Sequence, residues 1–421
     1  MRMKWKGWTL AFAPLLLLAT TSCRGGDDGA IKITVWVSEA DMAFARAVSE
    51  DFKAANPDKT YNFVFDVQGE NEIATRILND VENAADVFSF PNDQVPKLLN
   101  GDALTQLGGD RLQSVIARND ADAIDAATAE IDGQNGVFGF PYTDNTYFLY
   151  YDKSVLTETD VQSIDGILAK CSSTKKFAMP FADGWYTVSF YFGKDLGYEV
   201  TYGDNLQEST ITCNFNNQVG QQVTTAMWNI VKDSRVKGDA NDSKITAGFG
   251  DGSVAAAVSG IWNRTSIQTS LGDNFGVAKL PTYTFSDGTT QSQVQMVSFA
   301  GYKLMGVNNY SAQKAEALAF ADFYTNTQNQ IKHFESRGFL PTDTTARQDA
   351  RVQADPCAAA ITEQLQYSKP QKNVPSTLWK PMEGLGNAML TGVTSGNFNL
   401  VEQLNACVAA INKTAASGIT E

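Results

Sequence analysis

Histidine is almost absent from this chain, because its 421 residues include only His333. A Ser-His-Asp or Cys-His catalytic group and a His-rich metal site each need at least one well-placed imidazole. His333 lies in a helical stretch, where a packing or surface role is the simpler interpretation. The sequence also has no GxSxG, P-loop or GxGxxG motif. These absences argue against an enzyme, and we expect neither a metal nor a cofactor.

Basic side chains and long apolar runs are also scarce. The chain has 33 Lys and Arg against 47 Asp and Glu, a formal charge of −14. Because so acidic a chain repels phosphate backbones, we expect no nucleic-acid partner. A hydrophobic content of 43% and an aromatic content of 11% indicate a globular protein, and the length suggests two or three domains. Beyond the N-terminus, no segment is long and apolar enough to span a bilayer.

The N-terminus has the pattern of an export signal. Three basic residues in the first six positions precede the apolar run Leu10–Ala19. The following Thr20–Cys23 resembles the bacterial lipoprotein processing site, with Thr20 where Leu is usual. We predict that 1–22 is a lipoprotein signal peptide, that Cys23 anchors the protein on the outer side of the cell membrane, and that 23–30 is a flexible tether. Ordinary signal cleavage nearby is the alternative.

Four more cysteines lie in the body of the chain. An even number in an exported protein suggests disulfides, and four cysteines allow three connectivities. Sequence proximity favours Cys171–Cys213 and Cys357–Cys407, and four buried free thiols are the alternative. Because there is no CxxC spacing, a metal role for them is disfavoured.

The first hundred residues predict a βαβαβ unit. Alternating apolar residues indicate strands at Ile31–Val37 and Tyr61–Val67. Between them, Phe44, Val48 and Phe52 form one helical stripe, with a capping box expected at Ser38 and Asp41. A helix over about 70–83 should lead to a strand at Asp86–Phe90. This order is typical of a mostly parallel, doubly wound sheet.

A second unit of the same class follows. We predict strands near 137–140, 147–151, 254–258 and 275–280, and helices near 185–194 and 217–233, with a mainly helical tail from about 310. The sequence therefore predicts an α/β protein of two units with a ligand between them, since clefts between domains are common binding sites.

Tryptophan supplies the clearest hint of a ligand. Trp185, Trp262 and Trp379 stand at the ends of predicted elements, whereas Trp228 falls in a helical core stripe. Packing is the alternative role for each one, but the three together favour a binding platform. Aromatic faces bury the C–H-rich faces of a pyranose, and carboxylates and amides bind its hydroxyls. An acidic, aromatic site therefore suits a neutral sugar.

The stretch 85–107 places such polar groups at a strand end. The strand Asp86–Phe90 runs into Pro91-Asn92-Asp93-Gln94. Ligands of open α/β sheets bind outside the carboxyl ends of the strands. We therefore expect part of the site here.

Five short stretches carry a resemblance to a known family. They are Thr34–Val37, Ala85–Gln94, Phe140–Leu156, Gly260–Trp262 and Arg337–Thr342. In their order and spacing, from about Ile31 to Asn412, the chain resembles the extracellular solute-binding proteins of ABC sugar importers, and among them the maltose/maltodextrin-binding group.

The resemblance implies a set of sugar-binding positions. Phe90 matches an aromatic that is usually Trp, Asp93 matches a sugar-binding carboxylate, and Gln94 stands where some members have Arg. Asn145 stands where the family has a carboxylate, with Asp144 beside it as a substitute. Trp185 matches an aromatic of the second lobe, and Trp262 and Trp379 match stacking tryptophans. Polar contacts from the first lobe are implied near Glu39, Asp41 and Glu72.

The resemblance also implies a two-lobed periplasmic-binding-protein type II fold with about three hinge crossings. Lobe one is then 31–143 plus 298–343, and lobe two is 147–294 plus 345–413. The implied protein is a monomeric receptor that closes around malto-oligosaccharides (α-1,4 glucans) and delivers them to an ABC transporter permease. A receptor for another oligosaccharide and an exported glycoside hydrolase are the alternatives.

Overall fold

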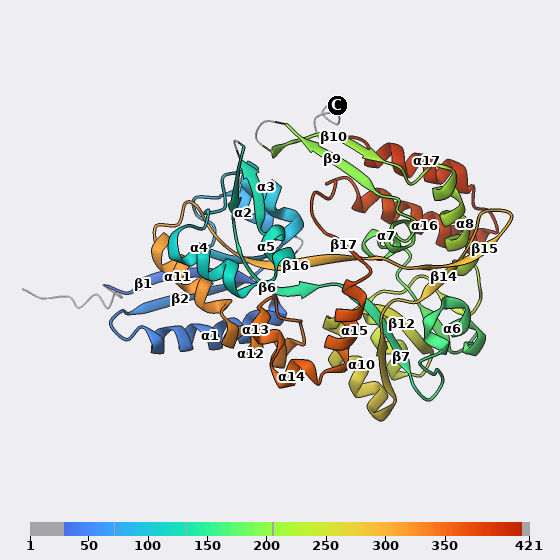
Figure 1. The fold of residues 1–421 in the computed structure, drawn as a ribbon, viewed down its shortest axis with the longest axis horizontal. Helices are drawn as coiled ribbons and strands as arrows, with labels where there is room; N and C mark the ends of the chain where they lie inside the picture. Colours follow the sequence, from blue (N-terminus) through green and yellow to red (C-terminus); the bar gives the residue numbers. More distant parts are fainter. Residues whose placement is uncertain (1–28, 71, 132, 204–205, 415–421) are drawn as a thin grey trace, which may run out of the picture.

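The computed structural model describes residues 29–70, 72–131, 133–203 and 206–414. The predicted signal peptide, Cys23 and all but the last two residues of the predicted tether lie outside the described residues. The described chain forms two lobes side by side, each built on its own β-sheet (Figure 1).

The sheet of lobe one has the strand order β17-β16-β3-β1-β2, with β6 also paired to β16. Strand β1 is parallel to β2 and β3, whereas β16 is antiparallel to β3 and β6. The strands are β1 (Ile31–Val37), β2 (Tyr61–Val67), β3 (Val87–Pro91), β6 (Phe140–Asn145), β16 (Ser298–Val307) and β17 (Ser368–Pro370). The expected doubly wound unit is therefore present, with an antiparallel strand added.

The sheet of lobe two has the order β11-β8-β12-β7-β13. Its strands are β7 (Tyr147–Asp152), β8 (Lys176–Ala178), β11 (Val236–Lys237), β12 (Val254–Gly260) and β13 (Phe275–Ala278). Every residue of β7 and β12 is buried, as expected for strands covered on both faces.

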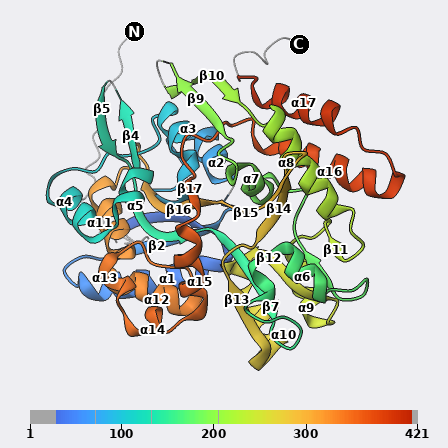
Figure 2. The ribbon, with the colours of Figure 1, turned by 45° about the vertical axis from the view of Figure 1, so that its right-hand side comes forward.

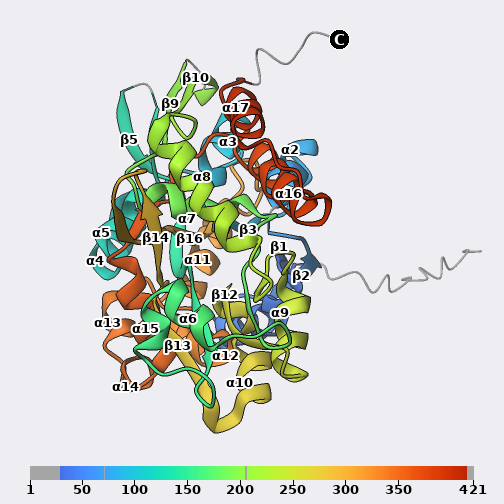
Figure 3. The same ribbon diagram turned by 90° about the vertical axis from the view of Figure 1, so that its right-hand side faces the viewer.

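Helices cover both sheets, and hairpins project from them. Figure 3 views lobe two end-on, with α17 at the top and α10 at the bottom. Around lobe one lie α1 (Met42–Ala55), α2 (Ile73–Asn79), α3 (Val95–Asn100), α4 (Gly109–Arg118), α5 (Ala121–Ala126), α11 (Lys314–Tyr324) and α12 (Thr327–Arg337). Lobe two has α6 (Ile164–Lys170), α7 (Gly184–Phe192), α8 (Gln218–Val231), α9 (Asp242–Gly250), α10 (Arg264–Leu271), α16 (Trp379–Ser395) and α17 (Leu400–Ile411). The chain between them forms α13 (Thr344–Arg347), α14 (Ala350–Gln353) and α15 (Pro356–Leu365). The hairpins are β4 (Thr128–Ile131) with β5 (Gln134–Val137), β9 (Tyr198–Tyr202) with β10 (Glu208–Cys213), and β14 (Thr282–Ser286) with β15 (Gln291–Gln295).

The chain passes between the sheets more than once. Only Thr146 separates β6 of the first sheet from β7 of the second, and β15 leads into β16 within three residues. Later, β17 pairs with the start of β16 before the chain enters α16 of lobe two. Strand β17 therefore belongs to the first sheet, although it lies within 345–413, the range predicted for lobe two. Figure 2 shows β16 and β17 in the middle of the molecule, between the lobes.

Three apolar cores hold the fold together. The stripe Phe44, Val48 and Phe52 of α1 is buried against the first sheet, as its spacing predicts. A second core fills lobe two. A third core joins Phe334 of α12 and Phe339 just after that helix to residues of lobe two and α15. The two lobes therefore share packing near the hinge.

Most predicted elements are confirmed, with local differences. The helix expected over 70–83 is the shorter α2. The expected capping box at Ser38 is wrong, because the Ser38 hydroxyl donates to the side chain of Asp41 (3.1 Å) and a 3-10 turn intervenes before α1. The side chain of Trp228 packs on Phe398, as a core stripe requires.

The predicted disulfides are not formed. Cys171, Cys213, Cys357 and Cys407 are free and buried. Cys357 lies in the third core and Cys407 in the core of lobe two, so this pair is divided between two cores. Cys171 follows α6, whereas Cys213 lies beside Asn412 after α17. Sequence proximity therefore gave the wrong pairing, and the alternative of four buried thiols describes the structure.

Within residues 29–70, 72–131, 133–203 and 206–414, no helix is long and apolar enough to cross a membrane. Within the same ranges, no group of three or more His, Cys, Asp or Glu residues is arranged to hold a metal ion.

Candidate ligand site between the lobes

Asp93 lies at the carboxyl end of β3, in the 3-10 turn Asn92–Gln94. Its side chain is half-buried, and within the described part of the chain its Oδ1 has no hydrogen-bond partner. Burial raises the pKa of Asp93 to about 6, while its own backbone N–H and, less strongly, the Gln371 side chain oppose the rise. Asp93 therefore carries a carboxylate oxygen that the protein itself leaves unused.

Asn92 fixes the turn that carries Asp93. Its Nδ2 donates to the backbone oxygen of Gln371 (2.7 Å), and its Oδ1 accepts from the backbone N–H of Tyr302 (2.9 Å). Because both ends of this buried amide are satisfied, the turn is held against β16 and the segment after β17.

Trp185 lies in the first turn of α7 of lobe two. The helix is capped by Asp183, whose carboxylate accepts from the Trp185 backbone N–H (2.9 Å). The indole is half-buried, with its ring centroid 4.5 Å from that of Tyr147 and 5.7 Å from that of Trp262. The indole N–H donates to Oε1 of Gln371 (2.9 Å).

Trp262 follows β12, and its ring lies over Gly260. A Cβ at Gly260 would come within 2.0 Å of that ring, so no larger residue fits there. The indole Nε1 of Trp262 lacks a hydrogen-bond partner in the described ranges. The two neighbouring indoles thus present an aromatic surface with an unused polar edge.

Trp379 is the first residue of α16 and sits edge-on to Phe299, with ring centroids 5.8 Å apart. Gly184 allows α16 to approach α7, because a Cβ there would meet the Met382 side chain at 2.6 Å and the Trp379 backbone oxygen at 3.6 Å. Trp379 therefore lies next to the start of the helix that carries Trp185.

Gln371 joins the two sides. It is bonded to Asn92 of lobe one, next to Asp93, and to Trp185 of lobe two, and its side chain lowers the pKa of Asp93. Asn145 ends β6 opposite Gly301, where the Gln371 Oε1 also lies, and in the described chain Asn145 Oδ1 has no partner. No motif in the sequence marks Gln371. We call the following residues the interlobe cluster: Asp93, Asn145, Trp185, Trp262, Gln371 and Trp379.

Asp41 does not join this cluster. It is fully buried and accepts from Arg337 Nε (2.9 Å), with His333 Nε2 3.3 Å away. Burial alone would raise its pKa, but the bond from His333 and the nearby charges of Lys303 and Arg337 hold the pKa well below its usual range. The expected sugar contact is therefore corrected to an internal ion pair. It also makes His333 a packing residue.

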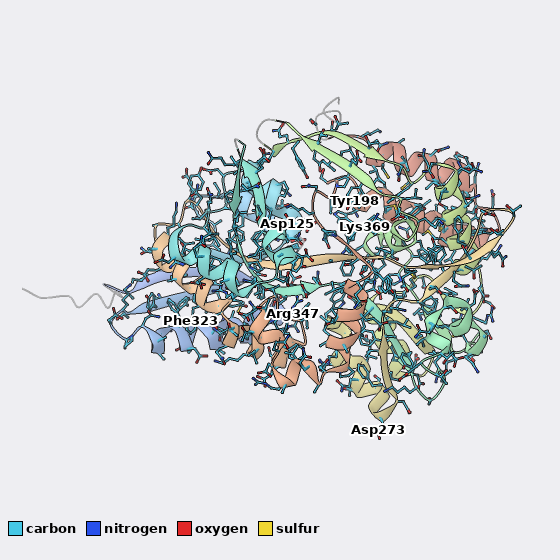
Figure 4. All side chains as sticks on the ribbon, viewed as in Figure 1. Asp125, Tyr198, Asp273, Phe323, Arg347 and Lys369 are labelled. Atoms are coloured by element: carbon cyan, nitrogen blue, oxygen red, sulfur yellow. The ribbon has the colours of Figure 1, made fainter. Side chains whose placement is uncertain are left out.

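Asp144 is likewise an internal residue. Its buried carboxylate pairs with Arg347 of α13, which also pairs with Asp120 (2.8 Å). Arg347 is labelled in Figure 4, between the lobes. Burial raises the pKa of Asp144 to about 7, although the charge of Arg347 opposes the rise. Asp144 thus takes part in a hinge contact, its Oδ1 has no hydrogen-bond partner in the described ranges, and its role as a substitute for the carboxylate at Asn145 stays a prediction.

Phe90 and Gln94 also differ from the implied roles. The Phe90 ring is fully buried, packs on Phe88 and fills the space beside Gly306, so no sugar can stack on it. The Gln94 amide accepts from the Ala74 backbone N–H (3.2 Å) and donates to the Glu70 backbone oxygen (3.2 Å). Both residues therefore shape lobe one from inside.

Glu39 and Glu72 are exposed at the same edge of lobe one. Glu39 lies in the turn after β1, and Glu72 pairs with Arg76 (3.4 Å) just before α2. No contact brings either of them to the interlobe cluster, and their role stays a prediction.

The interlobe cluster combines apolar faces with hydrogen-bond acceptors. Three half-buried indoles offer C–H-binding surface, while the free oxygens of Asp93 and Asn145 can accept from hydroxyl groups. Two surface hollows lie elsewhere, one between α1 and β2 and one between α6 and α8, and residues of the cluster line neither. The arrangement suits a neutral, hydroxyl-rich ligand.

Comparison with known proteins agrees with this architecture. A galactooligosaccharide-binding protein of Bacillus subtilis (strain 168) is 24% identical over 321 residues, which are 73% of this chain and 72% of the relative. A maltodextrin-binding protein of the same organism is 23% identical over 400 residues, or 90% and 91% of the two chains.

Solved structures are similar over nearly their whole length. One, determined with acarbose, has a TM-score of 0.80 at 29% identity and covers 91% of this chain and 99% of that chain. The maltodextrin-binding protein MalE1 from L. casei BL23 has a TM-score of 0.75 at 24% identity, covering 91% and 100%. These likenesses establish the two-lobed type II binding-protein fold.

The family model described as bacterial extracellular solute-binding protein matches residues 47–360. That range includes both sheets apart from β1 and β17, and the whole hinge from β6 to α13. This chain belongs to the family of bacterial extracellular solute-binding proteins.

Proposed function

We propose that this protein is the substrate-binding lipoprotein of an ABC sugar importer and that it captures malto-oligosaccharides between its lobes. The observation that carries the proposal is the interlobe cluster, in which Gln371 bonds Trp185, whose ring neighbours that of Trp262, and also bonds Asn92, next to Asp93 with its free Oδ1. Relatives named for maltodextrin support the choice of ligand.

The proposed action is binding without chemistry. A sugar face packs on the indoles of lobe two, and a hydroxyl donates to Asp93 of lobe one, so a bound sugar contacts both lobes. Its binding energy then favours the closed arrangement over the open one. The closed protein, held at the membrane through Cys23, presents the sugar to a permease and releases it unchanged.

Galacto-oligosaccharides are the second candidate ligand, because one relative is named for them. Aromatic faces and a carboxylate acceptor recognise features that both sugar classes share. The stacking residues alone therefore do not separate α-1,4 glucans from other neutral oligosaccharides.

Isothermal titration calorimetry tests the ligand. Residues 24–421 are titrated with maltose, maltotriose and a longer maltodextrin, then with a galacto-oligosaccharide, cellobiose and xylobiose. We expect selective binding of the α-1,4 glucans. Binding of the galacto-oligosaccharide alone would support a sugar receptor with a different ligand. If none of these sugars binds, the assignment as a sugar receptor is refuted.

Two further measurements address the remaining parts of the proposal. Chromatography of each sugar after overnight incubation should show it intact, and shortened products would indicate a glycoside hydrolase. The intact mass of protein extracted from membranes should include a lipid on an N-terminal Cys23. An unmodified N-terminus beyond Cys23 would refute the anchor.

A further inference from the structure

Gln371 occupies a place that no other side chain of the interlobe cluster shares. It is 6% exposed and lies in the segment between β17 and α16. Its Oε1 accepts the indole N–H of Trp185, which fixes the amide orientation and leaves Nε2 as the donor. Its backbone oxygen accepts from Nδ2 of Asn92, the residue before Asp93 (2.7 Å), and its side chain lowers the pKa of the Asp93 carboxyl. One neutral residue is therefore bonded to an aromatic of lobe two and to the turn of lobe one that carries Asp93.

The backbone of Gln371 is held as firmly as its side chain. Its N–H donates to the Ala300 oxygen (2.8 Å), and its own oxygen accepts from Asn92 (2.7 Å). At Gly301 a Cβ would come within 2.8 Å of the Gln371 Oε1, so the amide fills the space that glycine leaves. The amide is thus positioned from β16 and from the turn that carries Asp93.

The segment around Gln371 contacts the two lobes alternately. Lys369 Nζ lies 5.1 Å from the ring centre of Phe192 in lobe two, and Lys372 pairs with Asp125 of lobe one (2.7 Å). Figure 4 shows Lys369 beside Tyr198 and Asp125 on the opposite side of the same central region. The segment therefore bridges the lobes at the site, and Gln371 is the member that reaches the cluster.

We propose that Gln371 is a positioning residue of the ligand site, which holds the Trp185 indole and the Asp93 carboxylate in one geometry across the two lobes. The proposal rests on the proposed function, since it assigns how that site is assembled. With the indole N–H engaged by Gln371, a ring face of Trp185 and the free Oδ1 of Asp93 remain for the sugar.

The proposed role of Gln371 has a consequence for the ionisation of Asp93. An amide donor stabilises the ionised carboxylate, the form that accepts most strongly from a sugar hydroxyl. Tyr198 of β9 interacts electrostatically with Asp93, and burial raises the pKa of Tyr198 well above the usual range, so it stays neutral. Loss of the Gln371 donor should therefore move the titration of Asp93 upward.

The test uses three variants of the mature protein, residues 24–421. Gln371→Met keeps the length of the side chain and removes the amide. Gln371→Glu keeps the shape and adds a second carboxyl beside Asp93. Gln366→Met is the matched control, because Gln366 is exposed after α15. Maltotriose affinity is measured from pH 5 to 8, and the Asp93 carboxyl is titrated by carbon-13 NMR without sugar.

We expect Gln371→Met to raise the Kd for maltotriose about tenfold at pH 7, equivalent to about 1.4 kcal/mol. The midpoint of Asp93 titration should rise above that of the wild type. For Gln371→Glu, the ratio of its Kd to that of the wild type should be near one at pH 5 and above tenfold at pH 8, because two adjacent carboxylates repel. Gln366→Met should match the wild type throughout.

An unchanged Asp93 midpoint in both Gln371 variants would overturn the proposal, even if their thermal stability falls. If Gln371→Met does not fold, the Gln371→Glu variant tests the proposal alone, through its Kd relative to the wild type at pH 5 and at pH 8. If the wild-type protein binds no glucan, the proposed function fails, while the titration without sugar still tests whether Gln371 controls Asp93.

Discussion

Asp41 and Asp93 stand at the carboxyl ends of neighbouring strands, β1 and β3, of one sheet, yet they have opposite surroundings. Asp41 is fully buried between His333 and Arg337, and these partners hold its pKa below the usual range. Asp93 has no cation bonded to it in the described chain, its Oδ1 is unpaired, and burial raises its pKa to about 6. The comparison indicates that an acid with internal partners stabilises the fold, whereas an acid without them is available to a ligand.

The electrostatics of lobe one explain where this division falls. His333 is buried, and burial lowers its pKa, so the neutral ring donates from Nε2 to Asp41 and its Nδ1 stays unpaired in the described chain. Lys303, also buried, pairs with Glu70 and lies 4.2 Å from the ring centre of Phe339. Lys303 and Arg337 are therefore held by Glu70 and Asp41, and no cation is bonded to Asp93 in the described ranges.

Replacing Asp41 should give the largest effect on stability. Asp41→Asn leaves Arg337 without its buried carboxylate, so the free energy of unfolding should fall by roughly 3–5 kcal/mol at pH 7. Because the folded pKa lies below the ordinary value of 3.8, the stabilisation is present above that pH and is lost as the pH falls below it. Urea denaturation without sugar at several pH values measures both. A loss below about 1 kcal/mol at pH 7 would show that the pair is not structural.

Removing an indole from the interlobe cluster should weaken ligand binding more than replacing one of the acids does. Trp262→Ala should weaken binding of the best glucan by about 1–3 kcal/mol, through lost stacking and buried area. Trp228→Ala is the matched control, because Trp228 packs on Phe398 in the helix layer of lobe two. Calorimetry should show that the control keeps its affinity and loses only stability. Equal affinity for the two variants would remove Trp262 from the site.

Asp93→Asn should distinguish an acid with an unpaired oxygen from an acid with internal partners such as Asp41, because it should lower affinity without lowering stability. It replaces a charged acceptor by a neutral one, so affinity should fall by about 1–2 kcal/mol at pH 8. Since the folded pKa of about 6 exceeds the ordinary 3.8, ionised Asp93 destabilises the unliganded protein above pH 6 and not below pH 4. Thermal unfolding should therefore show the variant more stable than the wild type at pH 8, by on the order of 1 kcal/mol, and equal at pH 4. If the variant is instead less stable than the wild type at pH 8, Asp93 stabilises the fold as Asp41 does.

Exposed acids at the same edge should give the smallest effects. Glu39→Gln and Glu72→Gln should each change affinity and stability by less than about 0.5 kcal/mol, since an exposed ion pair such as Glu72 with Arg76 contributes little. The same calorimetric titration measures both. A tenfold loss of affinity in either variant would extend the site along lobe one and revise the comparison.

Much of the fold could be predicted because its signals are local. The alternation of β1 and β2 and the stripe of α1 set which face of each element is apolar. The pairing of thiols was not local, because Cys357 and Cys407 are near in sequence but lie in different cores. For the same reason the length of α2 was overestimated, since a periodic pattern does not show where tertiary contacts end a helix.

By itself the sequence determined the order of strands and helices, the acidic and His-poor composition, and the tryptophans at element ends. Only the tertiary structure decided which polar residues are free. Asp41 lies 292 positions from His333, and Asn92 lies 279 positions from Gln371. Periodicity acts over a few residues of chain, whereas ion pairing and burial depend on groups that the fold brings together from its far ends. For that reason Asp41 is part of the core, Asp93 keeps an oxygen without an internal partner in the described chain, and Gln371 stands between the lobes.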